Sequence, residues 1–188
     1  MPFMRVTDWY KFIICNYANN KGGLYIDATM GNGNDTLFLC RFSDKSSRVI
    51  AFDIQEIAIT NTAKLLRENN CLDKATLILD GHQHMKEYAK SESVDVICFN
   101  FGYLPGGDHS ISTTPKTSIE AIKGGLDLLK PMGIMSLCIY SGGDTGYEEK
   151  DEIMSYLNSL SLSKYNIISC HFMNRKKEPP FPVFIFKR

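Results

Sequence analysis

The 188-residue sequence has no excess of charge of either sign, because 21 basic residues are matched by 21 acidic ones. A neutral chain does not attract nucleic acid through its overall charge, so any such partner must be held by a local group of Lys or Arg side chains. The densest basic cluster is Arg175-Lys176-Lys177, and we expect Lys116 and Lys123 to extend it.

The sequence also lacks an apolar run of the ~18 residues that a membrane-spanning helix needs. Its first residues do not have the charged-then-apolar pattern of a secretory signal, so we expect a cytoplasmic protein with no membrane partner. The six cysteines include no C-x-x-C pair and are expected to be free thiols. His82-Gln83-His84 offers two metal ligands without a third nearby in sequence, so we expect no metal site.

Short apolar runs alternate with helical patterns along almost the whole chain, which is typical of parallel strands covered by helices on both faces. An amphipathic helix is predicted within residues 3–20. The predicted strands are 24–29, 48–54, 75–79, 94–101, 134–140, 165–172 and 182–186. The predicted helices are 35–41, 55–69, 84–90, 116–129 and 148–160, with a turn at 131–133.

The last two predicted strands, 165–172 and 182–186, are not separated by a helix. A short loop allows only an antiparallel return, since a parallel return needs a crossover. We therefore predict one α/β domain over residues 1–188, with a mostly parallel seven-stranded sheet and a C-terminal antiparallel hairpin. This plan is typical of Rossmann-like class I methyltransferases that use S-adenosylmethionine (SAM), whereas a dinucleotide-binding domain would continue strand by helix by strand.

The segment Asp27-Ala28-Thr29-Met30-Gly31-Asn32-Gly33-Asn34-Asp35-Thr36 joins the first predicted strand to a helix. Gly31 and Gly33 allow a tight turn and let a ligand approach the backbone closely. Thr36 occupies the position of the third glycine in the dinucleotide-binding fingerprint, which argues against a pyrophosphate site.

Acidic side chains end the second and third predicted strands. Asp53 is placed to accept hydrogen bonds from both hydroxyls of a ribose, and Asp80 lies where an adenine edge would be. With the glycine turn, they predict an adenosine site without a phosphate site; the alternative is that both aspartates only cap helices. The candidate cofactor-binding residues are Asp27, Thr29, Gly31, Asn32, Gly33, Asn34, Asp35, Thr36, Asp53, Ile54, Gln55, Asp80, Gly81, His82 and Asn100.

Asn100 lies at the end of the predicted central strand, and ligands of open α/β sheets bind at that edge. Many enzymes that methylate amino groups have an Asn-Pro-Pro-Tyr-like sequence here, in which the amide holds the target nitrogen and the aromatic ring stacks on the base. Asn100-Phe101-Gly102-Tyr103 is a looser version of it. The candidate catalytic residues are Asn100, Tyr103, Asp108 and His109, with the last two as proton acceptors.

These motifs resemble those of the small methyltransferases of the YtqB/MnmM type, once described as rRNA methylases. The matching segments are 27–33, 35–36, 53–55, 99–100, 102–108, 174 and 179–181, and the resemblance extends over residues 7–188. It implies SAM as the methyl donor and tRNA as the partner. The methylated group would be the 5-aminomethyl group of uridine 34 in the anticodon, often 2-thiolated, which becomes 5-methylaminomethyluridine. The resemblance also implies a cytoplasmic protein and is compatible with a homodimer.

Two positions depart from this family pattern, because Asn34 and Gly143 stand where histidines are usual. His82 and His109 are the candidates to take over any role of those histidines. Three alternatives stay open: a methyltransferase acting on rRNA or on a small-molecule amine, a protein that binds SAM or RNA without catalysis, and, more distantly, a nicotinamide-dependent oxidoreductase.

Overall fold

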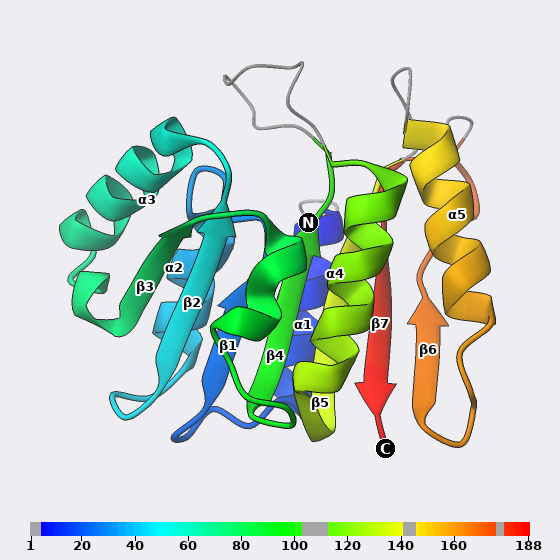
Figure 1. Cartoon of the computed structure of the whole chain (residues 1–188), viewed down its shortest axis with the longest axis horizontal. Helices are drawn as coiled ribbons and strands as arrows, with labels where there is room; N and C mark the ends of the chain where they lie inside the picture. The colour runs from blue at the N-terminus through cyan, green and yellow to red at the C-terminus, as the bar shows by residue number, and fades with distance from the viewer. Residues whose placement is uncertain (1–4, 103–112, 141–145, 176–178) are drawn as a thin grey trace.

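A computed structural model describes residues 5–102, 113–140, 146–175 and 179–188 (Figure 1). In these residues seven strands form one sheet in the order β3-β2-β1-β4-β5-β7-β6. The strands are β1 (Leu24–Asp27), β2 (Arg48–Asp53), β3 (Ala75–Leu79), β4 (Val94–Asn100), β5 (Leu129–Ile139), β6 (Tyr165–Ser169) and β7 (Phe181–Lys187). The helices are α1 (Val6–Tyr17), α2 (Asn34–Phe42), α3 (Glu56–Glu68), α4 (Pro115–Leu128), α5 (Gly146–Asn158) and the short 3₁₀ helices η1 (Leu72–Lys74) and η2 (His82–Glu87).

Strand direction confirms the predicted α/β class and the predicted hairpin. β1 to β5 pair in parallel, whereas β7 runs antiparallel to both β5 and β6. β7 lies between β5 and β6 and is antiparallel to both, so β6 points the same way as β1 to β5 and only β7 of the seven described strands is reversed. The carboxyl ends of these six parallel strands therefore share one edge of the sheet, the upper edge in Figure 1.

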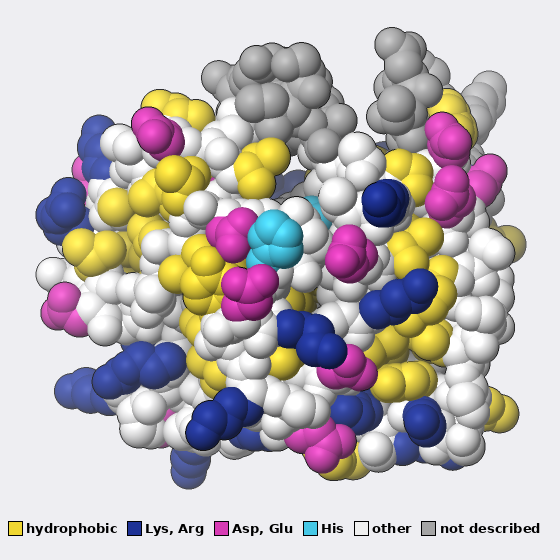
Figure 2. All heavy atoms as spheres, viewed as in Figure 1, with side chains coloured by type: hydrophobic (Ala, Val, Ile, Leu, Met, Phe, Trp, Pro, Cys, Tyr) yellow, Lys and Arg dark blue, Asp and Glu magenta, His cyan; other side chains and the backbone are white. Residues whose placement is uncertain are grey.

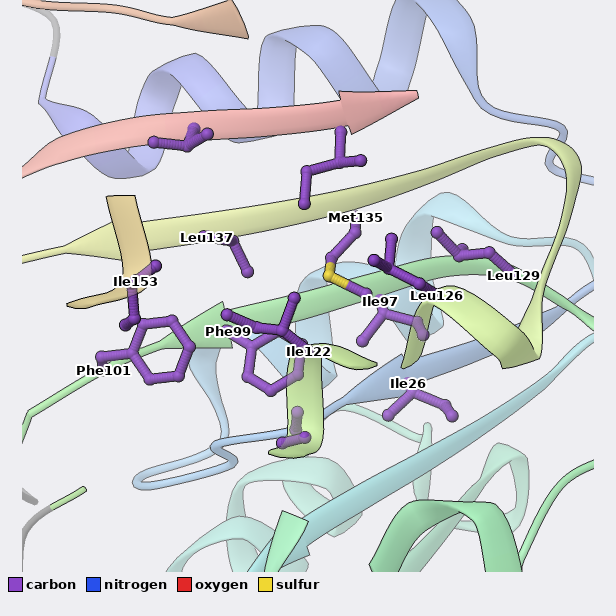
Figure 3. Close-up of a cluster of buried hydrophobic side chains, with 14 of the residues drawn as sticks. Ile26, Ile97, Phe99, Phe101, Ile122, Leu126, Leu129, Met135, Leu137 and Ile153 are labelled. Carbon is purple, nitrogen blue, oxygen red and sulfur yellow. The ribbon is translucent and has the colours of Figure 1, made fainter. Parts of the chain in front are cut away.

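Helices pack on both faces of the sheet. α4 and α5 lie in front of it in Figure 1 and α1 lies behind it. On the central strand β4, Ile97 and Phe99 join the buried cluster under α4 and α5, which Figure 3 shows, while Val96 and Cys98 join the cluster under α1, α2 and α3. This burial on both faces explains the continuous apolar run that predicted a central strand.

The clearest difference from the sequence prediction is in β5, which begins at Leu129 and includes the predicted turn at 131–133. Its register with β4 shifts between Val94, which pairs with Leu129, and Val96, which pairs with Ile134. Met132 has φ of 68° and is 81% exposed. The turn residues therefore form a bulge inside a strand, where Pro131 does not have to donate a ladder hydrogen bond.

Other bounds differ by a few residues. β1 ends at Asp27 because its carboxylate accepts a hydrogen bond from the Thr29 amide (3.3 Å), which turns the chain. β6 ends at Ser169, three residues before the predicted end, and the predicted helix 84–90 is the 3₁₀ helix η2. None of the helices described is long and apolar enough to cross a bilayer. That residues 1–188 form one domain stays a prediction.

Two adjacent glycines of α4 give a test of the packing between this helix and the sheet. A Cβ at Gly125 would lie 2.6 Å from Met135 Cε and 3.1 Å from Ile97 Cδ1, both in the core, whereas a Cβ at Gly124 would lie 3.3 Å from Cγ of the flexible Lys86. Helix propensity favours alanine at either position by about 0.5–1 kcal/mol. We therefore expect Gly124→Ala to raise the free energy of unfolding and Gly125→Ala to lower it by about 1–3 kcal/mol. Urea unfolding of both variants measures the difference. Equal effects would show that a Cβ at Gly125 fits between α4 and the sheet without strain.

Candidate functional site

The turn between β1 and α2 needs both of its glycines. Gly31 and Gly33 have φ of 52° and 79°, a region that other residues rarely adopt. A Cβ at Gly33 would also lie 2.7 Å from Oγ1 of Thr62 on α3, and that hydroxyl donates a hydrogen bond to the Gly31 carbonyl oxygen (3.1 Å). The turn is thus pressed against α3, and Asn32 is tied to the same helix by the Asn61 amide (3.0 Å).

Asp53, at the end of β2, fixes this turn from the neighbouring strand. One carboxylate oxygen accepts the Gly31 amide (3.0 Å) and the other accepts the Gln55 amide (2.9 Å) at the start of α3. Each carboxylate oxygen has a second lone pair, so Asp53 can hold the backbone and still accept hydroxyl groups of a ribose. The capping and ligand-binding interpretations of Asp53 are therefore compatible.

Two exposed apolar side chains lie next to Asp53. Ile54 follows it in sequence and is 57% exposed, and Leu79, which pairs with Asp53 in the register of β2 and β3, is 51% exposed. Exposed apolar side chains at the ends of adjacent strands provide a surface for a flat, apolar ring. Leu79 was missed by the sequence analysis, although its position immediately before Asp80 at a strand end was a usable signal.

Asp80 is engaged by the η2 segment. Its carboxylate accepts the Gly81 amide (2.7 Å) and the Tyr88 hydroxyl (3.0 Å), and it contacts Nδ1 of His84 at 2.8 Å. The hydrogen bond from His84 holds the pKa of Asp80 below its usual value, and the same contact raises the pKa of His84. These contacts occupy Asp80 more fully than Asp53 is occupied, and its contact with an adenine stays a prediction.

His82 points inward from η2 and not toward solvent. Its ring packs against Phe99 and Phe101, with centroid distances of 5.9 and 6.4 Å. Burial lowers its pKa to about 4, so the imidazole is neutral near pH 7. Within the described part of the chain its buried Nε2 atom has no hydrogen-bond partner.

Two acidic side chains lie behind the glycine turn. Asp27 is 1% exposed and accepts the Thr36 hydroxyl (2.6 Å), so Thr36, the residue in place of a third glycine, has a defined role. Asp35 accepts the hydroxyl of Tyr10 from α1 and the side-chain amide of Asn100 (3.4 Å). Burial raises the pKa of both carboxyl groups, and the charge of Asp35 adds to the cost of ionising Asp27.

This pair of carboxylates decides which ligand charge the turn favours. A pyrophosphate beside Asp27 and Asp35 would make the ionisation of these carboxyl groups still less favourable, whereas a sulfonium or ammonium group would favour their ionised forms and be attracted by them. The residues present therefore fit SAM, whose sulfur and amino group are cationic, better than a dinucleotide.

Asn100, at the end of β4, is held by three contacts. Its backbone amide donates to the Thr29 hydroxyl (2.6 Å), its side-chain Nδ2 donates to Asp35, and its Oδ1 accepts the hydroxyl of Tyr140 (3.1 Å). The contacts of Tyr10 and Tyr140 were missed by the sequence analysis. A tyrosine in the buried stripe of a helix, whose hydroxyl needs a partner, was the only signal for Tyr10.

The structure thus brings together the glycine turn, Asp53, Ile54, Gln55 and Asn100 at one edge of the sheet. Asn34 is exposed at the start of α2, so its replacement of a histidine changes the surface beside the turn and not the buried contacts. Tyr103, Asp108, His109 and Gly143 lie outside the described residues. In the described ranges, no group of three or more His, Cys, Asp or Glu side chains is placed to hold a metal ion.

Comparison with known proteins gives a consistent result. The family model described as "Putative rRNA methylase" matches residues 49–186. The chloroplastic tRNA (mnm⁵s²U34)-methyltransferase of Arabidopsis thaliana is 37% identical over 94% of this chain and 67% of its own length.

Solved structures similar to this chain are also those of methyltransferases. The crystal structure of a "putative rRNA-methylase" from Clostridium thermocellum is 41% identical, with a TM-score of 0.95 and full coverage of both chains. A "putative methyltransferase" from Streptococcus mutans in complex with S-adenosylhomocysteine (SAH) is 34% identical, with a TM-score of 0.88 and 99% coverage of both.

The buried carboxyl group of Asp27 predicts a measurable pH dependence of stability. Burial, with the nearby charge of Asp35, raises the pKa of Asp27 to about 7 in the folded state. The folded state therefore holds a proton that the unfolded state releases, so this group lowers the free energy of unfolding as pH rises from about 4 to about 7. We expect Asp27→Asn to remove that decline, so that its stability relative to the wild type improves across this range.

Urea unfolding at several pH values measures the effect. Asp44→Asn is a control with its effect at lower pH. Hydrogen bonds from Ser47, Gly22 and Ser46 lower the pKa of Asp44 from 3.8, so this carboxylate gains its stabilising effect below about pH 4 and contributes no slope between about pH 4 and pH 7. Parallel pH profiles for the wild type and Asp27→Asn would contradict the prediction.

Proposed function

The chain belongs to the family described as "Putative rRNA methylase" and is a SAM-dependent methyltransferase, and from this premise we propose that it methylates the 5-aminomethyl group of uridine 34 in tRNA. The observation that carries the proposal is the 37% identity, over 94% of the chain, to a tRNA (mnm⁵s²U34)-methyltransferase. The position of Asn100 at the carboxyl end of β4, beside the glycine turn, supports an amino group as the acceptor.

The cofactor half of the site lies over β1, β2 and β3. In the proposal Asp53 holds the ribose, Ile54 and Leu79 contact the adenine, and the backbone at Gly31 and Gly33 lies along the rest of the molecule. Bound SAM supplies a methyl group on a positively charged sulfur. Asp27 and Asp35 lie at the same turn, and this positive charge favours their ionised forms, which in turn attract it.

The acceptor half lies at Asn100. We propose that its Oδ1 accepts a hydrogen bond from the neutral 5-aminomethyl group, which points the nitrogen lone pair toward the methyl carbon. The new N–C bond forms as the C–S bond breaks, and the nitrogen then loses a proton. Positioning of this kind supplies most of the rate of an in-line displacement. Tyr103 as the stacking group, and Asp108 or His109 as the proton acceptor, complete the proposal.

An RNA partner has a suitable surface near the same edge. The segment after β6 leaves the carboxyl end of that strand, and its Arg175 guanidinium lies 4.8 Å above the Phe172 ring. Paired cations and aromatic rings bind unstacked bases and phosphates of single-stranded loops such as an anticodon loop. Basic and acidic side chains are interspersed on the face formed by α4, α5 and η2 (Figure 2), so we propose that Arg175 and its neighbours, with Lys116 and Lys123, form a local tRNA contact.

An rRNA substrate is the second candidate, because the matching family model is named for rRNA methylation. A cytoplasmic location and a homodimer also remain proposals; the relative from Arabidopsis thaliana is named as chloroplastic.

Mass spectrometry of nucleosides tests the proposed reaction. In tRNA from cells that lack the gene, we expect 5-methylaminomethyluridine to disappear and its 5-aminomethyl precursor to accumulate. Purified protein with SAM should convert that tRNA, and Asn100→Ala should convert it far more slowly. Methyl transfer to rRNA in place of tRNA would contradict the proposal and favour the second candidate.

The proposed contact of Asp53 with ribose predicts a loss of SAM affinity on substitution. Asp53→Asn keeps an acceptor for one backbone amide, so the turn is less disturbed than in an alanine variant. We expect SAM binding to weaken by roughly 1.5–3 kcal/mol, the typical range for lost hydrogen bonds to a charged group. Isothermal titration calorimetry measures this, with Asp73→Asn on the exposed η1 as the matched control. An unchanged dissociation constant would remove Asp53 from the SAM site.

A further inference from the structure

The side-chain amide of Asn100 forms a hydrogen bond at each of its two ends. Its Nδ2 lies 3.4 Å from Oδ2 of Asp35 on α2, and its Oδ1 lies 3.1 Å from the Tyr140 hydroxyl, just after β5. Two elements that flank β4 on opposite sides therefore meet at one amide. The Asp35 contact continues to α1, where the hydroxyl of the buried Tyr10 donates to Oδ1 of the same carboxylate.

The chemistry of these partners selects one orientation of the amide. An ionised carboxylate only accepts hydrogen bonds, so Asp35 must face the NH₂ end of Asn100. With Asn100 so oriented, the Tyr140 hydroxyl, which can donate or accept, donates to the carbonyl oxygen at the other end. The Tyr10 hydroxyl donates to Oδ1 of Asp35, and the Asn100 side chain donates to Oδ2 of the same carboxylate.

Orientation matters because the two ends of an amide have opposite effects on an acceptor amine. The carbonyl oxygen accepts an N–H of the amine and leaves the nitrogen lone pair free to attack. A flipped amide would donate its own N–H to that lone pair and occupy it. Since oxygen and NH₂ are nearly the same size, shape alone does not prevent the flip.

We propose that Asp35 and Tyr140 are positioning residues that hold Asn100 with its carbonyl oxygen toward the acceptor amine, and that Tyr10 holds Asp35 for this purpose. The inference rests on the proposed function, because it assigns these residues to the amine-binding step of that reaction. It also gives Asp35 a role apart from cofactor contact. A carboxylate at this position, although it lies close to the buried Asp27, offers Asn100 only acceptor oxygens and so fixes the amide.

An exchange of the two groups tests the proposal. In Asp35→Asn the acceptor becomes an amide that allows either orientation of Asn100, and we expect kcat at saturating SAM to fall about ten-fold or more. The loss of SAM affinity that follows from the lost negative charge is measured separately and does not enter kcat. Asn100→Asp should also lose activity, because its carboxylate would face that of Asp35. In the double variant a carboxylate at position 100 can accept from the amide at position 35 and still face the amine, so its kcat should exceed that of Asp35→Asn.

Tyr140→Phe is the second variant. It removes the hydroxyl that donates to Asn100 and leaves the side chains of Asp27 and Asp35 unchanged. We expect it to lower kcat with little change in SAM affinity, and Tyr17→Phe, at the exposed end of α1, is the matched control. All variants are assayed on tRNA that carries the 5-aminomethyl group, with SAM binding measured separately.

The outcomes separate the two proposals. If the wild type transfers no methyl group to this tRNA, the proposed function fails and the positioning role fails with it. If the wild type is active but the double variant loses the product of the two single losses, or if Tyr140→Phe keeps full kcat, the positioning role alone is overturned.

Discussion

The interaction on which the site depends is the packing of two carboxyl groups, the buried Asp27 and the partly buried Asp35, beside one glycine turn. Buried carboxylates are costly unless donors surround them, and here the donors come from four different segments. Thr29 and Thr36 serve Asp27, while Tyr10 and Asn100 serve Asp35. Satisfying this pair therefore fixes α1, the turn, α2 and the end of β4 relative to one another. A carboxylate left without its donors would lower the stability of the folded state, and this penalty favours one relative arrangement of these elements.

The residues at the two halves of the sheet edge differ in the kind of contact they make. Over β2 and β3, Asp53 accepts two backbone amides, and Asp80 accepts one backbone amide and the Tyr88 hydroxyl, so residues that look like ligands are also structural. Over β4 and β5, Asn100 and Tyr140 engage each other through side chains. One departure from the family pattern lies elsewhere, because Asn34 is exposed and does not take part in these contacts. A histidine lost at that position leaves the buried contacts intact.

The sequence predicted those features that follow from local pattern. The apolar run 94–99, the glycines at 31 and 33, and the helix-free connection before β7 were enough for the fold class, the turn and the reversed strand. It did not predict the bulge of β5, because a Pro-Met-Gly sequence is equally suited to a turn and to a bulge until the neighbouring strand is known. The contacts Tyr10–Asp35 and Tyr140–Asn100 join residues 25 and 40 positions apart, and such pairs depend on side-chain direction in the folded protein.

The reversed strand has a consequence for how the protein is made. β7 is the last described strand in chain order, yet it lies between β5 and β6 and pairs with both. During synthesis on the ribosome, β1 to β5 can assemble as they emerge, but β6 has no place to pair until Phe181–Lys187 has left the exit tunnel. The apolar edge of β5 is meanwhile uncovered. Completion of the sheet therefore waits for the synthesis of residues 181–187, and a nascent chain stalled before residue 181 presents an open strand edge to chaperones and proteases.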